Sequence, residues 1–134
     1  MGERLNLQPD GPHSDDYTET LARGFAEVVR VLNYATGSHA SAGLTCPQTV
    51  YTLAGNLSGG SAGLDQLFRQ MTTYLTEARG HVADTSGNAP AKVTDALERL
   101  AGARAAASAL ARDLSGLQSA TSGLYLPDSD DMEP

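Results

Sequence analysis

Apolar residues recur every three or four positions along most of this chain, the spacing of helices that bury one face. The first such segment predicts a helix over about 15–36, with Ser14 as its N-cap and Gly37 as its stop. Asp15 and Asp16 favour this start, because acids stabilise the positive end of a helix dipole. The apolar positions of this helix are Tyr17, Leu21, Phe25, Val28, Val29 and Leu32.

The middle of the chain predicts a short helix over about 46–57 and a longer one over about 62–83. Thr45 and Gln48 have the spacing of a capping box, with the threonine as N-cap of the short helix. The sequence Ser-Gly-Gly-Ser at 58–61 is expected to end that helix, because paired glycines favour a turn.

The longest periodic segment predicts a helix over 90–124, which would be ~50 Å long against ~33 Å for the helix over 62–83. Its far end therefore needs cover from another helix or another subunit. Two series repeat every seven residues and predict a heptad seam. They are Val93, Leu100, Ala107, Leu114 and Thr121, and Ala96, Ala103, Leu110, Leu117 and Leu124.

No segment shows the strict alternation of a β-strand. We therefore expect an all-α fold, an antiparallel four-helix bundle with one short helix and one long C-terminal helix. The 134 residues suit a single domain. We expect a flexible N-terminal lead over 1–13, a helical bundle domain over 14–126 and a disordered acidic tail over 127–134.

The net charge of −7 is concentrated at the C-terminus, where the last eight residues contain four acids and no base. The segment 14–126 has ten acids and eight bases and is close to neutral. Without a basic stripe, binding to nucleic acid or to an anionic membrane surface is not expected. A partner-binding role and a solubilising role both remain open for the acidic tail. The N-terminus shows no basic region followed by an apolar run, so we expect a cytoplasmic protein.

Few residues suggest chemistry. The three histidines, His13, His39 and His81, have no acid or second histidine at metal-ligand spacing. Cys46 is the single cysteine, and an inert thiol is favoured over a nucleophile because no base is in view. We expect no catalytic residue, cofactor, metal or small-molecule substrate, and hence no enzyme.

Two features favour contact with another chain. Residues 31–64 contain no acid, lysine or arginine, and charge is depleted at the cores of interfaces. A close contact within the chain is the alternative explanation. Residues 100–107 are rich in alanine, which lets a second helix approach closely, and a two-fold dimer is the simplest arrangement. A solvated helix stabilised by the high helix propensity of alanine is the alternative. The candidate interface residues are Val50, Tyr51, Leu53, Leu57, Leu100, Ala103, Ala107, Leu110, Leu114 and Leu117.

Residues 45–75, with Val50-Tyr51, Gly55 and Leu57 followed by Leu64, and the alanine-rich helix after them resemble small all-helical actinobacterial proteins of unknown function. That resemblance implies no activity. Leu57-Ser58-Gly59, placed between two predicted helices, resembles the Leu-x-Gly form of the turn motif in helical-hairpin proteins of type VII secretion.

The sequence therefore predicts a non-enzymatic interaction, scaffolding or regulatory protein that acts through helix surfaces, as a homodimer and with a further protein partner. The alternative is a type VII secretion substrate or chaperone-like protein.

Overall fold

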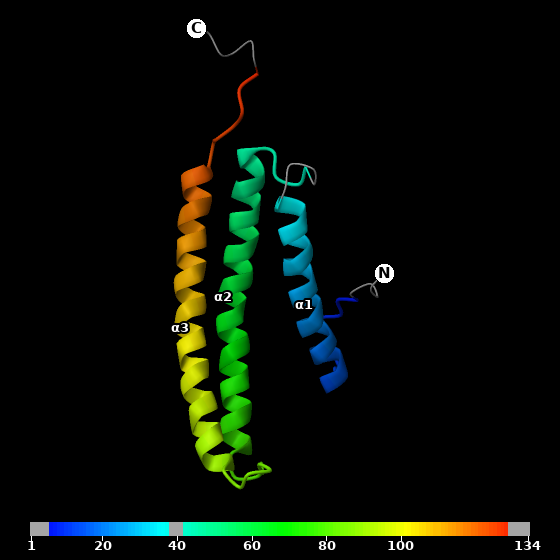
Figure 1. Cartoon of the computed structure of the whole chain (residues 1–134), viewed down its shortest axis with the longest axis vertical. Coiled ribbons are helices and arrows are strands. Elements are labelled where there is room, and N and C mark those ends of the chain that lie inside the picture. The colour runs from blue at the N-terminus through cyan, green and yellow to red at the C-terminus, as the bar shows by residue number, and fades with distance from the viewer. Residues whose placement is uncertain (1–5, 38–41, 129–134) are drawn as a thin grey trace. The chain divides into compact units, whose positions relative to one another are not determined.

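The computed structural model describes residues 6–37 and 42–128, which form three helices and no strand. The helices are α1 (Asp15–Thr36), α2 (Pro47–Ala78) and α3 (Ala89–Thr121) (Figure 1). The all-α class is confirmed, and the four-helix prediction is wrong. The chain divides into two units, Met1–Thr45 and Cys46–Pro134, which are described one at a time. Residues 1–5 of the predicted lead and 129–134 of the predicted tail lie outside the described residues.

The first unit contains α1, which has the predicted bounds. Ser14 is its N-cap, and the Ser14 hydroxyl accepts a hydrogen bond from the Tyr17 amide at 3.1 Å. The Tyr17 hydroxyl donates to the carbonyl oxygen of Asn6 at 2.6 Å and accepts from the amide of Gln8 at 2.7 Å. The His13 ring stacks on the Tyr17 ring, with 5.1 Å between their centroids. Tyr17 thus attaches the described part of the lead, residues 6–13, to the first turn of α1.

The helix α2 runs without interruption through the segment 58–61, where the sequence predicted a turn. Two serines explain why the helix continues. The Ser58 hydroxyl donates to the carbonyl oxygen of Ala111 on α3 at 2.9 Å, and Ser61 is buried. Packing against α3 therefore outweighs the helix cost of the intervening glycines, which is about 1 kcal/mol each. Leu57-Ser58-Gly59 consequently lies inside α2 and at no turn.

The start of α2 also differs from the capping-box prediction. Its N-cap is Cys46, whose backbone is extended, and Pro47 opens the helix. Proline is well suited to a first helical position because its missing N–H has no partner there in any case. With Cys46 as N-cap, Thr45 lies outside the helix and Gln48 falls one position too early for the predicted box.

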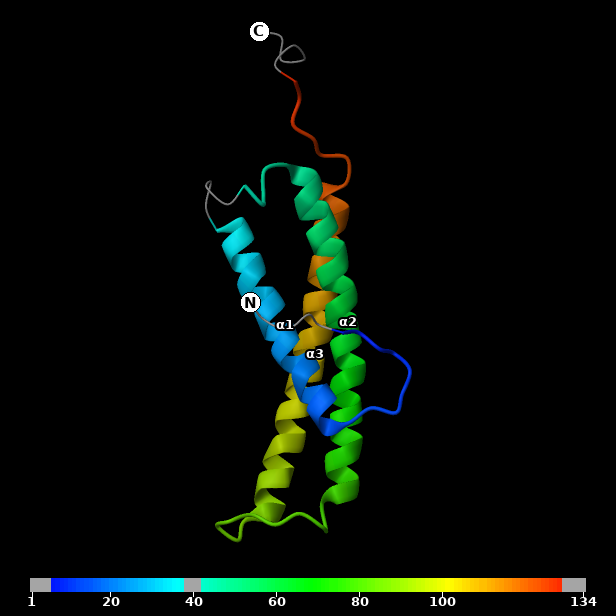
Figure 2. The same cartoon turned by 90° about the vertical axis from the view of Figure 1, so that its right-hand side faces the viewer.

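The second unit is an antiparallel hairpin in which α2 and α3 lie side by side along their length (Figures 1 and 2). Each helix contributes a seam with alternating spacings of four and three residues, the spacing of paired helices in a coiled coil. Two contacts fix the register: Ser58 faces Ala111, and Asp65 faces Arg104. On α2 the seam is Ala54, Ser58, Ser61, Asp65, Phe68, Thr72 and Leu75, and on α3 it is Val93, Leu97, Leu100, Arg104, Ala107, Ala111, Leu114, Gln118 and Thr121.

The predicted α3 seam is therefore half correct. The series that begins at Val93 faces α2, with Val93, Leu100 and Ala107 buried. The second predicted series does not lie in the seam. The seam positions are instead the residues that each follow one of its members, and Leu110 and Leu117 are exposed. Small residues on α2 near Ser61 lie opposite small residues on α3, so the two helices approach closely there. This close approach favours the row one residue further along α3 as the second half of the seam.

The hairpin turns between Ala78 and Ala89 around Asp84. The Asp84 carboxylate accepts from the Lys92 ammonium at 2.7 Å and from the Ser86 amide at 3.0 Å. These hydrogen bonds, that from Lys92 most of all, lower the pKa of Asp84 to about 2. Gly87 has a φ of +75°, a conformation that residues with a Cβ adopt only at a cost.

Candidate interaction surface

The hairpin of α2 and α3 has an apolar face beside its seam. On each helix, this face consists mainly of residues that come one position before a seam residue. We call it the hairpin face. It comprises Leu53, Leu57, Leu64, Leu67 and Met71 on α2, and Ala96, Ala103, Leu110 and Leu117 on α3.

The two rows lie on the same side of the hairpin because the helices are antiparallel. In a helix, the residue before a seam residue lies about 100° to one side of it. Reversing the second helix brings its preceding residues to that same side.

Several large side chains of the hairpin face are exposed to water. Leu110 is 50% exposed, Leu67 45% and Leu57 43%. In contrast, only five of the described residues are buried in the chain, namely Ala54, Ser61, Val93, Leu100 and Ala107. Contiguous exposed leucines of this kind mark a contact surface in soluble proteins. The hairpin face is the candidate functional site.

An ion pair crosses the seam beneath this face. The Asp65 carboxylate accepts from Arg104 of α3 at 3.1 Å and from Arg69 of α2 at 2.7 Å. These contacts, the Arg104 hydrogen bond first, hold the pKa of Asp65 below its ordinary value. A half-buried pair at one seam position favours one register of the two helices, since a shift would separate Arg104 from the Asp65 carboxylate. The pair thereby helps to determine which residues reach the hairpin face.

The structure divides the predicted interface residues into three groups. Leu53, Leu57, Ala103, Leu110 and Leu117 belong to the hairpin face. Five others lie elsewhere: Leu100, Ala107 and Leu114 lie along the seam, and Val50 and Tyr51 lie near the start of α2, where Tyr51 lines a pocket with Ser119. Leu100 and Ala107 are buried against α2 and are not available to a second chain.

Four members of the face were not among the predicted interface residues: Ala96 on α3, and Leu64, Leu67 and Met71 on α2. The three on α2 lie beyond the glycines at 58–61, which were assigned to a turn. The seven-residue spacing of Leu57, Leu64 and Met71 across those glycines was the available indication of a continuous face.

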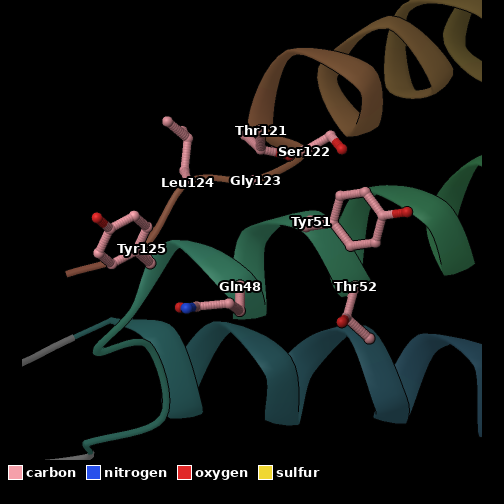
Figure 3. Close-up of a pocket in the computed structure, with 8 residues that line it drawn as sticks. All are labelled: Gln48, Tyr51, Thr52, Thr121, Ser122, Gly123, Leu124 and Tyr125. Carbon is pink, nitrogen blue, oxygen red and sulfur yellow. The ribbon is translucent and has the colours of Figure 1, made fainter. Parts of the chain in front are cut away.

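A pocket of about 310 Å³ lies at the open end of the hairpin (Figure 3). Tyr51 and Gln48 project from the first turns of α2, and the chain leaving α3 closes the other side. Gly123, with a φ of +79°, allows that chain to turn away from the helix. The full lining is Gln48, Tyr51, Thr52, Thr121, Ser122, Gly123, Leu124 and Tyr125. It holds amide and hydroxyl groups and no charged side chain, so it offers no base to activate a nucleophile.

Cys46 lies at the N-terminus of α2, and its Sγ is 3.4 Å from the Thr49 hydroxyl. Hydrogen bonds with Thr49, that of the side chain first, lower the pKa of the Cys46 thiol. Within residues 6–37 and 42–128, no histidine, cysteine or acid side chains gather in a group that would hold a metal ion. His13 contacts Tyr17 and Gln8, and His39 lies outside the described residues.

No helix in the described part of the chain combines the length and the apolar character needed to cross a membrane. No protein-family model matches the chain, and neither a curated protein nor a solved structure matches it.

Proposed function

We propose that this protein is a non-enzymatic interaction or scaffolding protein that acts through the hairpin face and self-associates as a homodimer. One observation carries the proposal: the hairpin buries few apolar residues in its own seam and leaves a row of leucines on one side in water. Fully burying a leucine contributes about 1.5–3 kcal/mol, so covering this row has a large driving force.

The size of the face fits this function. A helix of 32 residues is ~48 Å long at ~1.5 Å per residue, and two packed helices are roughly 18 Å wide. The face therefore extends over roughly 900 Å², against the ~800 Å² per partner that stable interfaces bury. No acid, lysine or arginine is among its nine residues, as is typical of interface cores.

The type VII secretion alternative loses its supporting motif. In that resemblance the Leu-x-Gly motif lies at the turn of a hairpin, whereas Leu57-Ser58-Gly59 lies within α2. The hairpin turn of this chain, between Ala78 and Ala89, contains no such sequence. The homodimer is therefore the preferred proposal, while a cytoplasmic location stays a prediction.

Light scattering on matched double variants tests the proposal. Leu110→Gln with Leu117→Gln places amides on the hairpin face and should leave a monomer at 20 µM, where the wild type is a dimer. Ala101→Gln with Ala105→Gln places the same groups on the other side of α3 and should leave the dimer intact. Circular dichroism must show that both variants keep their helices. Equal masses for both variants would refute this role of the hairpin face.

A further inference from the structure

Along α3, the residues of the hairpin face change from small to large, a pattern that matches a second copy of the same helix running in the opposite direction. The α3 row of the hairpin face begins with two alanines, Ala96 and Ala103, and continues with two leucines, Leu110 and Leu117. The alanine half of this surface is shallow and the leucine half protrudes. Two such surfaces are complementary when one is rotated by 180° so that its helices run in the opposite direction. We propose that two copies of this chain pair their hairpin faces about a two-fold axis that passes beside Ala106, with the two α3 helices antiparallel. This inference rests on the proposed function.

Positions along α3 support this axis. In such a pair, Ala106 lies level with Ala106 of the second copy, and residues equally far before and after it face each other. Ala103 lies three residues before Ala106 and Leu110 four residues after it. Leu110 of each copy therefore projects toward the space left by Ala103 of the other. Ala96 and Leu117, ten before and eleven after, repeat this relation at the ends of the row.

Charge complementarity provides independent support. Arg99 lies seven residues before Ala106, and Asp113 lies seven residues after it. Both are exposed at the outer edge of the hairpin face, one position before the seam residues Leu100 and Leu114, and Arg99 also pairs with Asp95 of its own helix at 3.1 Å. The pairing therefore brings Arg99 of each copy beside Asp113 of the other, twice in the dimer. Opposite charges at such flanking positions set the orientation of paired helices.

On α2, one glycine and one leucine stand in the same relation to the axis. The pairing of Asp65 with Arg104 places Gly63 level with Ala106, across the hairpin. Gly60 lies three residues before Gly63, and Leu67 lies four residues after it. A Cβ at Gly60 would meet nothing within 4 Å in the single chain, so that surface is open. Leu67 of the second copy projects toward it, which lets the α2 helices approach.

A parallel arrangement of the hairpins, with the axis along their length, is distinguishable from this one. It would place α3 against α2 of the second copy and would separate Ala106 from its equivalent. In that arrangement, Arg99 of one copy would not lie beside Asp113 of the other. The size pattern and the charge pattern of α3 both favour the antiparallel pair.

Site-specific cross-linking of the full chain tests the position of the axis. In a Cys46→Ser background, Ala106→Cys should be joined to a dimer by a short bismaleimide reagent. Ala105→Cys, the exposed neighbour on the other side of α3, is the matched control and should stay monomeric on a denaturing gel. If wild type sediments as a dimer and Ala106→Cys does not cross-link above the control, the antiparallel axis is wrong although self-association stands. If wild type is a monomer at 100 µM, the proposed function itself is wrong.

Charge exchange tests the orientation by a separate route. Arg99→Glu should raise the dissociation constant of the dimer about tenfold, because two exposed ion pairs become repulsive contacts. Asp113→Arg should have the same effect. The double variant should return to within about threefold of wild type, since the pairs form again with exchanged signs. Arg112→Glu, on the other flank, should change the constant less than about threefold. Additive losses in the double variant would overturn the pairing of Arg99 with Asp113.

Discussion

The replacement of Gly59 by alanine distinguishes a continuous α2 from two helices joined by a turn. Gly59 lies inside α2, and a Cβ built on it would meet no atom within 4 Å. Alanine in a helix interior is more stable than glycine by about 1 kcal/mol. Gly63 is equally open and lies away from the hairpin face. The double variant, Gly59→Ala with Gly63→Ala, should therefore gain about 2 kcal/mol in free energy of unfolding.

Urea denaturation followed by far-ultraviolet circular dichroism measures this gain. All proteins must be compared at one concentration, because self-association adds to the apparent stability. The midpoint should rise for the single variant and rise again for the double variant, with an unchanged slope. By heat, the double variant should unfold roughly 4–10 °C above wild type.

Gly87→Ala is the matched control, since Gly87 has a φ of +75° in the hairpin turn. It should lose about 1–2 kcal/mol, the cost of that conformation for a residue with a Cβ. If residues 58–61 formed a turn with left-handed glycines, Gly59→Ala would lose stability as Gly87→Ala does. That result would refute the continuous helix and with it the hairpin face.

Three further predictions concern other parts of the chain. Ala107→Leu enlarges a side chain that is 5% exposed in the seam and should destabilise the hairpin by about 1–3 kcal/mol in urea denaturation, whereas Ala105→Leu on the exposed side should not. Ser14→Ala removes the cap of α1 and should cost that helix about 1 kcal/mol, seen as faster hydrogen exchange at the Tyr17 amide. Because the folded-state pKa of Asp84 is lowered from 3.8 to about 2, its contribution to stability is present above about pH 4 and is lost as the pH falls toward 2. Asp84→Asn should therefore flatten the acid side of the stability profile, and an unchanged profile would contradict the role of this carboxylate.

Local patterns in the sequence were sufficient for α1. A serine cap, two acids and a regular apolar spacing all lie within one helix, so its bounds follow from neighbouring residues. The same reasoning predicted the length of α3 to within three residues at its end, where Gly123 turns the chain.

The continuity of α2 was not predictable from local patterns, because the residues that maintain it are distant in the chain. The Ser58 hydroxyl donates to the carbonyl oxygen of Ala111 on α3, and Ser61 is buried. Helix propensity at the glycines favours a turn, and this tertiary contact overrides it. The choice of seam row on α3 depends on the same contact, so the prediction placed Leu110 and Leu117 in the heptad seam.

The candidate surface was therefore only partly predictable. Leu110 and Leu117 of α3 were predicted as interface residues, although they were also assigned to the heptad seam. The leucines of α2 beyond Gly60 required the continuous helix before they joined the row. Arg99 and Asp113 have meaning only once a two-fold axis relates them, which no pattern within a single helix shows.

Sedimentation equilibrium of the intact chain between 1 and 100 µM tests the central claim, that the hairpin face is covered by a second copy. The apparent mass of wild type should rise with concentration toward twice the chain mass of 13.9 kDa. The Leu110→Gln, Leu117→Gln variant should stay at the mass of one chain throughout. A wild-type mass of one chain at every concentration would show that no second copy covers the hairpin face.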